Sequence, residues 1–139
     1  MLSLETAVKL KSAGLEWKPE LLDFFAIPDR QMDERVFVIS DMLVTVEVLQ
    51  GLQVVAFQGA SEWALDSLVT MDAVWIPRES QIRKALEAAL IARGRPEMRL
   101  TSSLTGYRCE YFQNGEIYTF EGDEASEVYA RALLNLLDQ

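Results

Sequence analysis

The pattern that most limits the fold is a series of strand-length segments and turn dipeptides in the last third of the chain. Asn114-Gly115 fits a two-residue type I′ hairpin turn, because both central residues of that turn need a positive φ. A turn of this kind fixes the register of the strands on either side of it. The predicted register pairs Tyr111 with Tyr118, Cys109 with Phe120, and Arg108 with Glu121.

Thr105-Gly106 is a second turn candidate, so residues 98–121 predict a three-strand meander of Met98–Leu104, Tyr107–Phe112 and Glu116–Glu121. The same reasoning sets Leu104 opposite Tyr107 and Leu100 opposite Tyr111. Together the two turns place one set of side chains on a single face, which we expect to be buried. The set is Leu100, Leu104, Tyr107, Cys109, Tyr111, Tyr118 and Phe120.

The first half of the chain also has strand-like segments. Val36–Ile39 is rich in β-branched residues, residues 44–48 alternate apolar and polar, and residues 54–57 are apolar again after the turn candidate Gln50-Gly51. These three segments predict a second meander. Residues 21–28 fit either one more short strand or a helical turn, and Val74-Trp75-Ile76 is a short apolar segment that stops at a proline.

Four segments carry apolar residues at helical spacing. They are residues 1–14, with Ser3 as N-cap and Gly14 after the last turn; residues 61–71, with Trp63, Ala64, Leu68 and Met71 on one face; residues 79–93; and residues 124–137.

These elements predict an α+β fold with antiparallel sheet or sheets packed by about four helices. The order helix, three-strand meander, helix occurs twice, at about residues 1–72 and 78–139. Phe57-Gln58-Gly59 and Phe120-Glu121-Gly122 echo each other, and both an internal repeat and chance similarity stay open. We expect residues 1–139 to form a single domain, because a chain of this length can bury a core of its own.

Composition narrows the chemistry. The 139 residues include no histidine and one cysteine, Cys109. Intrachain disulfides, His/Cys zinc sites and histidine-dependent nucleophilic catalysis are therefore excluded. Cys109 lies mid-strand on the predicted buried face, where a thiol is inert. No Gly-rich phosphate loop is present, so we expect no catalytic residues and no bound cofactor.

The formal net charge is −9, and the basic residues are spread along the chain. Nucleic-acid binding needs clustered Lys and Arg, so we expect none. A partner protein with a basic surface, an acidic decoy that binds a DNA-handling protein, and simple solubility all fit this charge.

Two acidic groups are candidate sites. Asp29, Asp33, Glu34 and Asp41 in the loop 29–41 offer oxygen ligands for a divalent cation, which would support a small-ligand or metal-dependent enzyme. The segment lacks the glycine and spacing of a calcium loop, and neighbouring arginines would repel a cation, so we expect a solvated loop without a metal. Asp123, Glu124 and Glu127 begin the last helix, where carboxylates stabilise the positive end of the helix dipole.

Trp17 is the tryptophan we expect to be partly exposed, because charged residues flank it. Exposed aromatic residues often anchor interfaces, so Trp17 is our candidate interface residue. Trp63 and Trp75 lie in apolar contexts and are expected in the core. An edge strand such as Val36–Ile39 or Met98–Leu104 could pair with a second copy, so a homodimer is a reasonable expectation.

The chain has no segment with the apolar length of a membrane helix, and its start does not have the pattern of a signal peptide. With a single cysteine as well, we expect a cytoplasmic protein with no membrane partner.

Several motifs occur together along the chain: Leu10-Lys11, Ala13-Gly14-Leu15, Trp17-Lys18-Pro19, Val36–Ile39, Trp63-Ala64-Leu65, Trp75-Ile76-Pro77 ahead of Gln81-Ile82, and the final helix at 130–137. In this combination the chain resembles a family of small uncharacterised bacterial and phage-associated proteins, some of which carry a loose pilus-assembly label. The resemblance implies no known activity, and no catalytic residues follow from it.

The sequence therefore predicts a non-enzymatic protein-binding or accessory domain, homodimeric in one version of this hypothesis. A divalent-metal or small-ligand enzyme using residues 29–41 and an acidic decoy are the alternatives.

Overall fold

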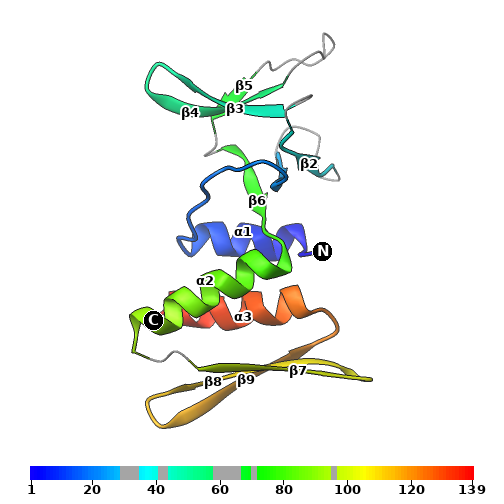
Figure 1. The fold of residues 1–139 in the computed structure, drawn as a ribbon, viewed down its shortest axis with the longest axis vertical. Coiled ribbons are helices and arrows are strands. Elements are labelled where there is room, and N and C mark those ends of the chain that lie inside the picture. Colours follow the sequence, from blue (N-terminus) through cyan, green and yellow to red (C-terminus); the bar gives the residue numbers. More distant parts are fainter. Residues whose placement is uncertain (29–34, 41–43, 58–66, 70–71, 95–96) are drawn as a thin grey trace. The chain divides into compact units, whose positions relative to one another are not determined.

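The computed structural model describes residues 1–28, 35–40, 44–57, 67–69, 72–94 and 97–139. Figure 1 shows the elements, which are α1 (Leu4–Ser12), β1 (Phe24–Ala26), β2 (Phe37–Val38), β3 (Val44–Leu49), β4 (Leu52–Phe57), β5 (Ser67–Val69), β6 (Val74–Ile76), α2 (Glu79–Ala92), β7 (Met98–Ser103), β8 (Gly106–Gln113), β9 (Glu116–Gly122) and α3 (Ala125–Leu137). The chain divides into two compact units, one of residues 1–15 with 77–139 and one of residues 16–76.

The α+β class is confirmed, but the predicted arrangement is wrong in detail. The described residues form three helices and three antiparallel three-stranded sheets, in the orders β2-β1-β6, β3-β4-β5 and β7-β8-β9. They do not form two helix–meander–helix units with four helices. The predicted first meander fails because β2 pairs with β1 rather than with β3. The single domain of residues 1–139 and the internal repeat at about 1–72 and 78–139 both stay predictions.

The predicted helix at 61–71 is wrong over Ser67–Val69, which form β5 and pair with β4. Val54 of β4 is the register partner of Val69, so the ladder of backbone hydrogen bonds with β4 outweighs the helical spacing of the apolar residues. The rest of that segment, including Trp63, Ala64 and Met71, lies outside the described residues.

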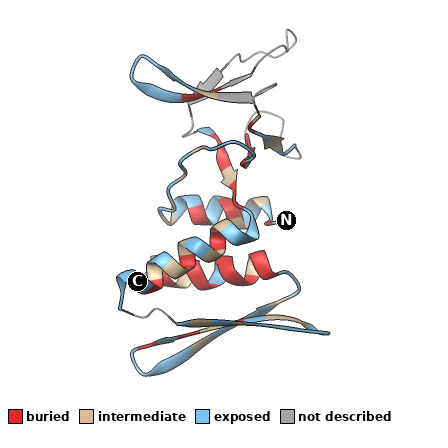
Figure 2. Cartoon of the chain, in the orientation of Figure 1, coloured by how far each residue is buried: buried red, intermediate tan, exposed pale blue. Residues whose placement is uncertain are grey.

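In the first unit, α3 packs against β8 and β9, while α1 and α2 pack against α3 (Figure 1). Figure 2 shows buried residues along much of α3, and the apolar positions Ile82, Leu86 and Leu90 of α2 are fully buried at four-residue spacing. The predicted caps of α1 are confirmed. Ser3 accepts a hydrogen bond from the Thr6 N–H, and Gly14 follows the last turn with a φ of +99°.

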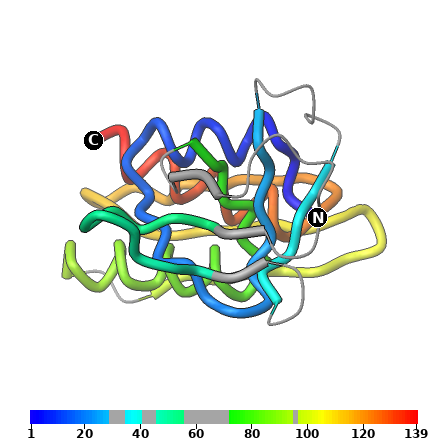
Figure 3. The backbone as a smooth tube through the Cα atoms, turned by 90° about the horizontal axis from the view of Figure 1, so that it is seen from above, coloured from blue at the N-terminus to red at the C-terminus, as the bar shows by residue number. Residues whose placement is uncertain are grey.

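The β8–β9 hairpin has the predicted register, with Tyr111 opposite Tyr118 and Cys109 opposite Phe120. Asn114 and Gly115 both have a positive φ, as a type I′ turn requires. The yellow-to-orange tube in Figure 3 follows β7, β8 and β9 back and forth through these hairpins.

The predicted register of the β7–β8 hairpin is wrong by two residues. Leu104 and Thr105 form the turn, so Ser103 faces Gly106 and Leu100 faces Cys109. Gly106 is thus the first residue of β8, at a point where an added Cβ would lie 2.6 Å from the Gly122 carbonyl oxygen. Leu104, predicted to be buried, is fully exposed in the turn.

A shift of two residues leaves every side chain on its predicted face. Cys109 and Tyr111 are buried on the helix side of the sheet, and Tyr107, Tyr118 and Phe120 are half-buried there, as is Leu100. Tyr111 stacks against Tyr118 and Phe120, with ring centroids 5.4 Å and 5.9 Å away, and its hydroxyl accepts a hydrogen bond from the Asn135 side chain of α3. Except at Leu104, the predicted buried face is therefore confirmed.

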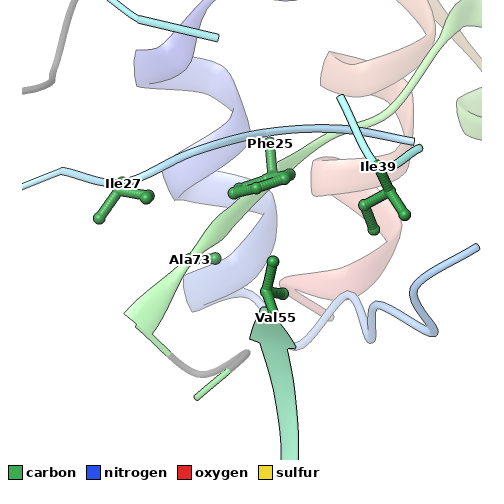
Figure 4. Close-up of a cluster of buried hydrophobic side chains, with 5 residues drawn as sticks. All are labelled: Phe25, Ile27, Ile39, Val55 and Ala73. Carbon is green, nitrogen blue, oxygen red and sulfur yellow. The ribbon is translucent and has the colours of Figure 1, made fainter. Parts of the chain in front are cut away.

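The second unit has a core of its own. Figure 4 shows its buried side chains, which are Phe25, Ile27, Ile39, Val55 and Ala73. They come from β1, from β4 and from the segments next to β1, β2 and β6, so the two small sheets of this unit share one apolar cluster. Residues 21–28, for which strand and helical turn both stayed open, contain the strand β1.

Candidate interaction surfaces

The first candidate surface is built around a tight turn in the second unit. The Asp23 N–H donates to the Glu20 carbonyl at 3.2 Å, so residues 20–23 close a four-residue turn. Leu22, at its third position, has a φ of +70°, whereas Leu21 does not have a positive φ. This combination is typical of a type II turn, whose third position strongly favours glycine or asparagine. A leucine there carries backbone strain.

Neither leucine of the turn contributes its side chain to the core. Leu21 is 56% exposed and Leu22 is 63% exposed. Strain is ordinarily retained where the surroundings hold the backbone and the side chain has a use. The Leu21 and Leu22 side chains are not buried among the described residues of the second unit, so packing in that core does not explain why the strained conformation is retained.

The turn is held by backbone hydrogen bonds and by one buried carboxylate. The Leu22 N–H donates to the Ile39 carbonyl at 2.8 Å, and the Ile39 N–H donates to the Asp23 carbonyl at 3.0 Å. The Asp23 side chain is 1% exposed, and its Oδ2 accepts from the Glu20 N–H at 3.1 Å and from Trp17 Nε1 at 3.0 Å. Asp23 therefore fixes the turn, while Leu21 and Leu22 extend from it.

Trp17 supports this turn from inside. It is half-buried, as its flanking charges predicted, and its ring lies parallel to Trp75 with centroids 6.5 Å apart and tilted against Phe25 at 5.8 Å. Trp75, predicted to be in the core, is also half-buried. Trp17 is thus connected through Asp23 to the turn that carries the exposed leucines. The role of Trp17 as an interface residue stays a prediction.

One exposed valine, Val38, lies next to the residue after β2 that is bonded to the turn. Val38 of β2 faces Phe24, and it precedes Ile39, whose backbone bonds the turn. Val36 and Val38 are both exposed, whereas Phe37 between them packs on Phe25 with ring centroids 5.4 Å apart. We call Leu21, Leu22 and Val38 the leucine-turn patch.

The second candidate surface is the face of the β7–β8–β9 sheet that points away from α3. We call it the open face. The register places ten residues on it: Arg99, Thr101, Ser103, Gly106, Arg108, Glu110, Phe112, Ile117, Thr119 and Glu121. Opposite charges are neighbours across the strands, because Arg99 faces Glu110 and Arg108 faces Glu121, with Arg108 Nε 2.7 Å from Glu121 Oε1.

The open face has exposed apolar side chains at one end and a hollow near each end. Phe112 and Ile117 face each other across β8 and β9, and each is 56% exposed. Next to them lies a hollow of about 370 Å³ lined by Glu97, Arg99 and Glu110. At the other end of β8, Gly106 lies at a second hollow of about 470 Å³, lined also by Thr101, Ser103 and Arg108.

In the first unit, the titratable side chains of Cys109 and Glu127 have pKa values shifted by their surroundings. Burial, with a smaller contribution from the Glu110 carboxylate, raises the pKa of the Cys109 thiol to about 11. Glu127, one of the three acids predicted at the start of the last helix, lies in the first turn of α3 as predicted, and it also bonds to the start of α1. Its Oε1 accepts from the Ser3 N–H at 2.7 Å and its Oε2 accepts from the Thr6 hydroxyl at 2.8 Å.

The candidate metal ligands of the acidic loop, Asp29, Asp33, Glu34 and Asp41, lie outside the described residues. Among the residues that are described, no three acidic or sulfur ligands gather closely enough to hold a metal ion. In that part of the chain there is also no helix with the length and apolar character needed to cross a membrane.

Comparisons of the chain with protein-family models, with curated proteins and with solved structures found no significant match. The resemblance to uncharacterised bacterial and phage-associated proteins therefore stays a prediction.

The sequence analysis named Trp17 as the candidate interface residue, which stays a prediction, and it did not point to Leu21 and Leu22, whose turn is held by Asp23, the hydrogen-bond partner of Trp17. A leucine with positive φ has no signature in the sequence, because that conformation is normally signalled by glycine or asparagine. The hollow at Gly106 was missed for a related reason, since this glycine was interpreted as a turn residue.

Proposed function

We propose that this chain is a non-enzymatic protein-binding domain that docks a basic partner protein through the leucine-turn patch. The observation that carries the proposal is Leu22, which has a φ of +70° in the turn held by the buried Asp23 carboxylate and yet is 63% exposed. Glycine or asparagine would relieve the strain, so a leucine at this position is best explained by a contact that its side chain makes with another molecule.

The rigidity of the turn also supports a docking role. Its backbone is bonded to Ile39, and Asp23 connects it to the stacked Trp17 and Trp75 rings. An apolar side chain presented on a rigid turn loses little conformational entropy on binding, which is the usual property of an interface anchor.

The charge of the chain indicates the chemistry of the partner. At a formal charge of −9, association with a basic surface is favoured at long range, and association with an acidic surface is disfavoured. The partner we propose therefore combines an apolar pocket for Leu22 with a positively charged surround.

The test uses immobilised wild-type protein and two variants in extracts of the source cells. Leu22→Asn removes the apolar side chain but keeps the N–H that donates to Ile39, and asparagine tolerates a positive φ. Leu104→Asn is the matched control, because Leu104 is a fully exposed leucine in another turn.

We expect wild type and Leu104→Asn to retain the same basic polypeptide at low ionic strength, and Leu22→Asn to lose it. Retention should fall at about 0.5 M salt, where long-range attraction is screened. The proposal is wrong if Leu22→Asn retains the same proteins as wild type, or if the retained proteins are acidic.

The two alternative functions have less support. Isothermal titration of the protein with Mg²⁺, Mn²⁺ and Ca²⁺ tests the metal-dependent enzyme directly, since its candidate ligands in the loop 29–41 should produce heat on binding. An acidic decoy would present acids without interspersed basic residues, whereas Arg99 and Arg108 alternate with Glu110 and Glu121 on the open face.

A further inference from the structure

We infer that the open face of the β7–β8–β9 sheet binds a second copy of this chain, in a two-fold dimer with the strands of the two sheets running in opposite directions. The inference is independent of the leucine-turn patch, which belongs to the other unit. It rests on the order of the open-face residues along β8, which are Gly106, Arg108, Glu110 and Phe112.

When this row of side chains is turned end to end and laid over itself, positive residues meet negative ones. When one β8 strand is laid face to face over another with its direction reversed and centred between Arg108 and Glu110, each Arg108 lies over the other copy's Glu110. The same operation lays each Phe112 over the other copy's Gly106. A two-fold interface of this kind forms every contact twice.

The same pairing brings the two ends of the face together. Phe112 and Ile117, each 56% exposed, form its apolar end and help to line the hollow of about 370 Å³. The hollow of about 470 Å³ lies at the position that Phe112 of the second copy would reach, and Gly106, Thr101 and Ser103 are among the residues that line it. Sheets that pack face to face lie ~10 Å apart, a distance that side chains from both faces fill.

Charge favours this register over its neighbours. A shift of the centre by one residue on the same face, onto Arg108 or onto Glu110, would place that residue over its own copy and set like charges together. The residues next to the two-fold axis are also displaced least by the twist between packed sheets.

The footprint is small. Three strands ~4.8 Å apart and about seven residues long cover roughly 15 Å by 23 Å, which is below the area of a standard stable interface. Each copy carries a formal net charge of −9, so two copies repel at long range, although the two arginines and two glutamates of the open face balance each other. We therefore expect a weak dimer, with a dissociation constant on the order of 10–500 µM at a salt concentration that screens this repulsion.

The experiment measures self-association of the full chain by sedimentation equilibrium at about 0.15 M salt. Glu110→Arg alone places two arginines over each other twice, and Arg108→Glu alone does the same with two glutamates. Each variant should dimerise at least about tenfold more weakly than wild type. Lys84→Glu, a charge reversal at an exposed position on α2, is the control and should dimerise like wild type.

The decisive sample is an equimolar mixture of the Glu110→Arg and Arg108→Glu variants. In a mixed dimer, the arginine introduced at position 110 of one copy lies over the glutamate introduced at position 108 of the other. The unchanged Arg108 of the first copy and the unchanged Glu110 of the second keep their native contact. The mixture should therefore recover dimer formation that neither variant shows alone.

Circular dichroism confirms that each variant is folded, and Phe112→Ser gives an independent route, since it should weaken the dimer without any charge change. Three results would each overturn the inference: a wild-type chain that stays monomeric up to about 1 mM, single variants that dimerise like wild type, or a mixture that fails to recover the dimer.

Discussion

Glu127 of α3 accepts a hydrogen bond from the Ser3 backbone N–H at 2.7 Å and so satisfies a donor at the N-terminus of α1. The two residues are 124 positions apart in the sequence. Its second oxygen accepts from the Thr6 hydroxyl, while Ser3 itself caps the Thr6 N–H. One carboxylate therefore joins the first turns of α1 and α3.

The hydrogen bonds of Glu127 make the stability of the folded chain depend on pH. Burial alone would raise the pKa of Glu127, but the hydrogen bonds from Ser3 and Thr6 outweigh it and hold that pKa below its ordinary value. The stabilisation is therefore fully present above the ordinary pKa of a glutamate and is lost as the pH falls through the lowered pKa of the folded state. Glu127→Gln should lower the free energy of unfolding by about 1 kcal/mol near neutral pH.

The measurement is urea unfolding of wild type and Glu127→Gln from pH 7 to pH 3. The difference between the two should shrink toward the acid end, because the wild-type carboxylate becomes protonated there. Glu116→Gln, at an exposed glutamate at the start of β9, serves as the control. A difference that stays constant across this range would contradict the assignment.

Substitution of Leu22 should affect stability and partner binding in opposite directions. Leu22→Asn should raise the free energy of unfolding by about 0.5–1 kcal/mol, because asparagine accepts the positive φ more readily and little buried area is lost. Thermal and urea unfolding measure this change. A loss of more than about 1 kcal/mol would show that the side chain stabilises the folded chain itself, and the argument for a docking role would fail.

Substitution of Gly106 tests the observed register of the β7–β8 hairpin. Gly106→Ala should lower the free energy of unfolding by about 2 kcal/mol or more, since the new Cβ would lie 2.6 Å from a backbone oxygen of Gly122. Gly115→Ala is the matched comparison, because it also has a positive φ but has no atom within 4 Å of the added Cβ. It should cost only the backbone strain, about 1 kcal/mol. Equal losses in the two variants would be inconsistent with the close approach of Gly106 to Gly122.

Cys109 provides a clean chemical readout, because it is the single cysteine of the chain. It is fully buried, and burial holds its pKa at about 11, so the reactive thiolate is scarce near neutral pH. A thiol reagent such as dithionitrobenzoate should react with about one thiol per chain in denaturant and at a rate at least ~100-fold lower without it. Rapid reaction of the folded protein would show that the thiol is accessible.

Local rules predicted the parts of the fold that short-range chemistry determines. Asn114-Gly115 fixed the β8–β9 register because a type I′ turn has a single alignment of its strands, and Ser3 and Gly14 bounded α1 through their capping preferences. The error at Thr105-Gly106 moved the pairing by two residues, an even number, and so left the buried face unchanged except for Leu104.

Long-range pairing was not predictable in the same way. The strands β1, β2 and β6 have two or three residues each and lie far apart in the sequence. Segments this short have no periodic pattern, so the sequence does not indicate that they share a sheet. Ser67–Val69 has helical spacing with its neighbours but is a strand because β4 offers it a ladder. The candidate site depends on such tertiary bonds too, since Ile39 and Asp23 hold Leu22 in a conformation its own chemistry disfavours.

The measurement that tests the central claim most directly is photo-cross-linking from the leucine turn. A photoreactive amino acid replaces Leu22 in one variant and Leu104 in the other, and both are irradiated in living source cells. The account predicts a specific adduct between position 22 and one basic polypeptide, with no such adduct from position 104. Absence of any adduct from position 22, or the same adducts from both positions, would contradict it.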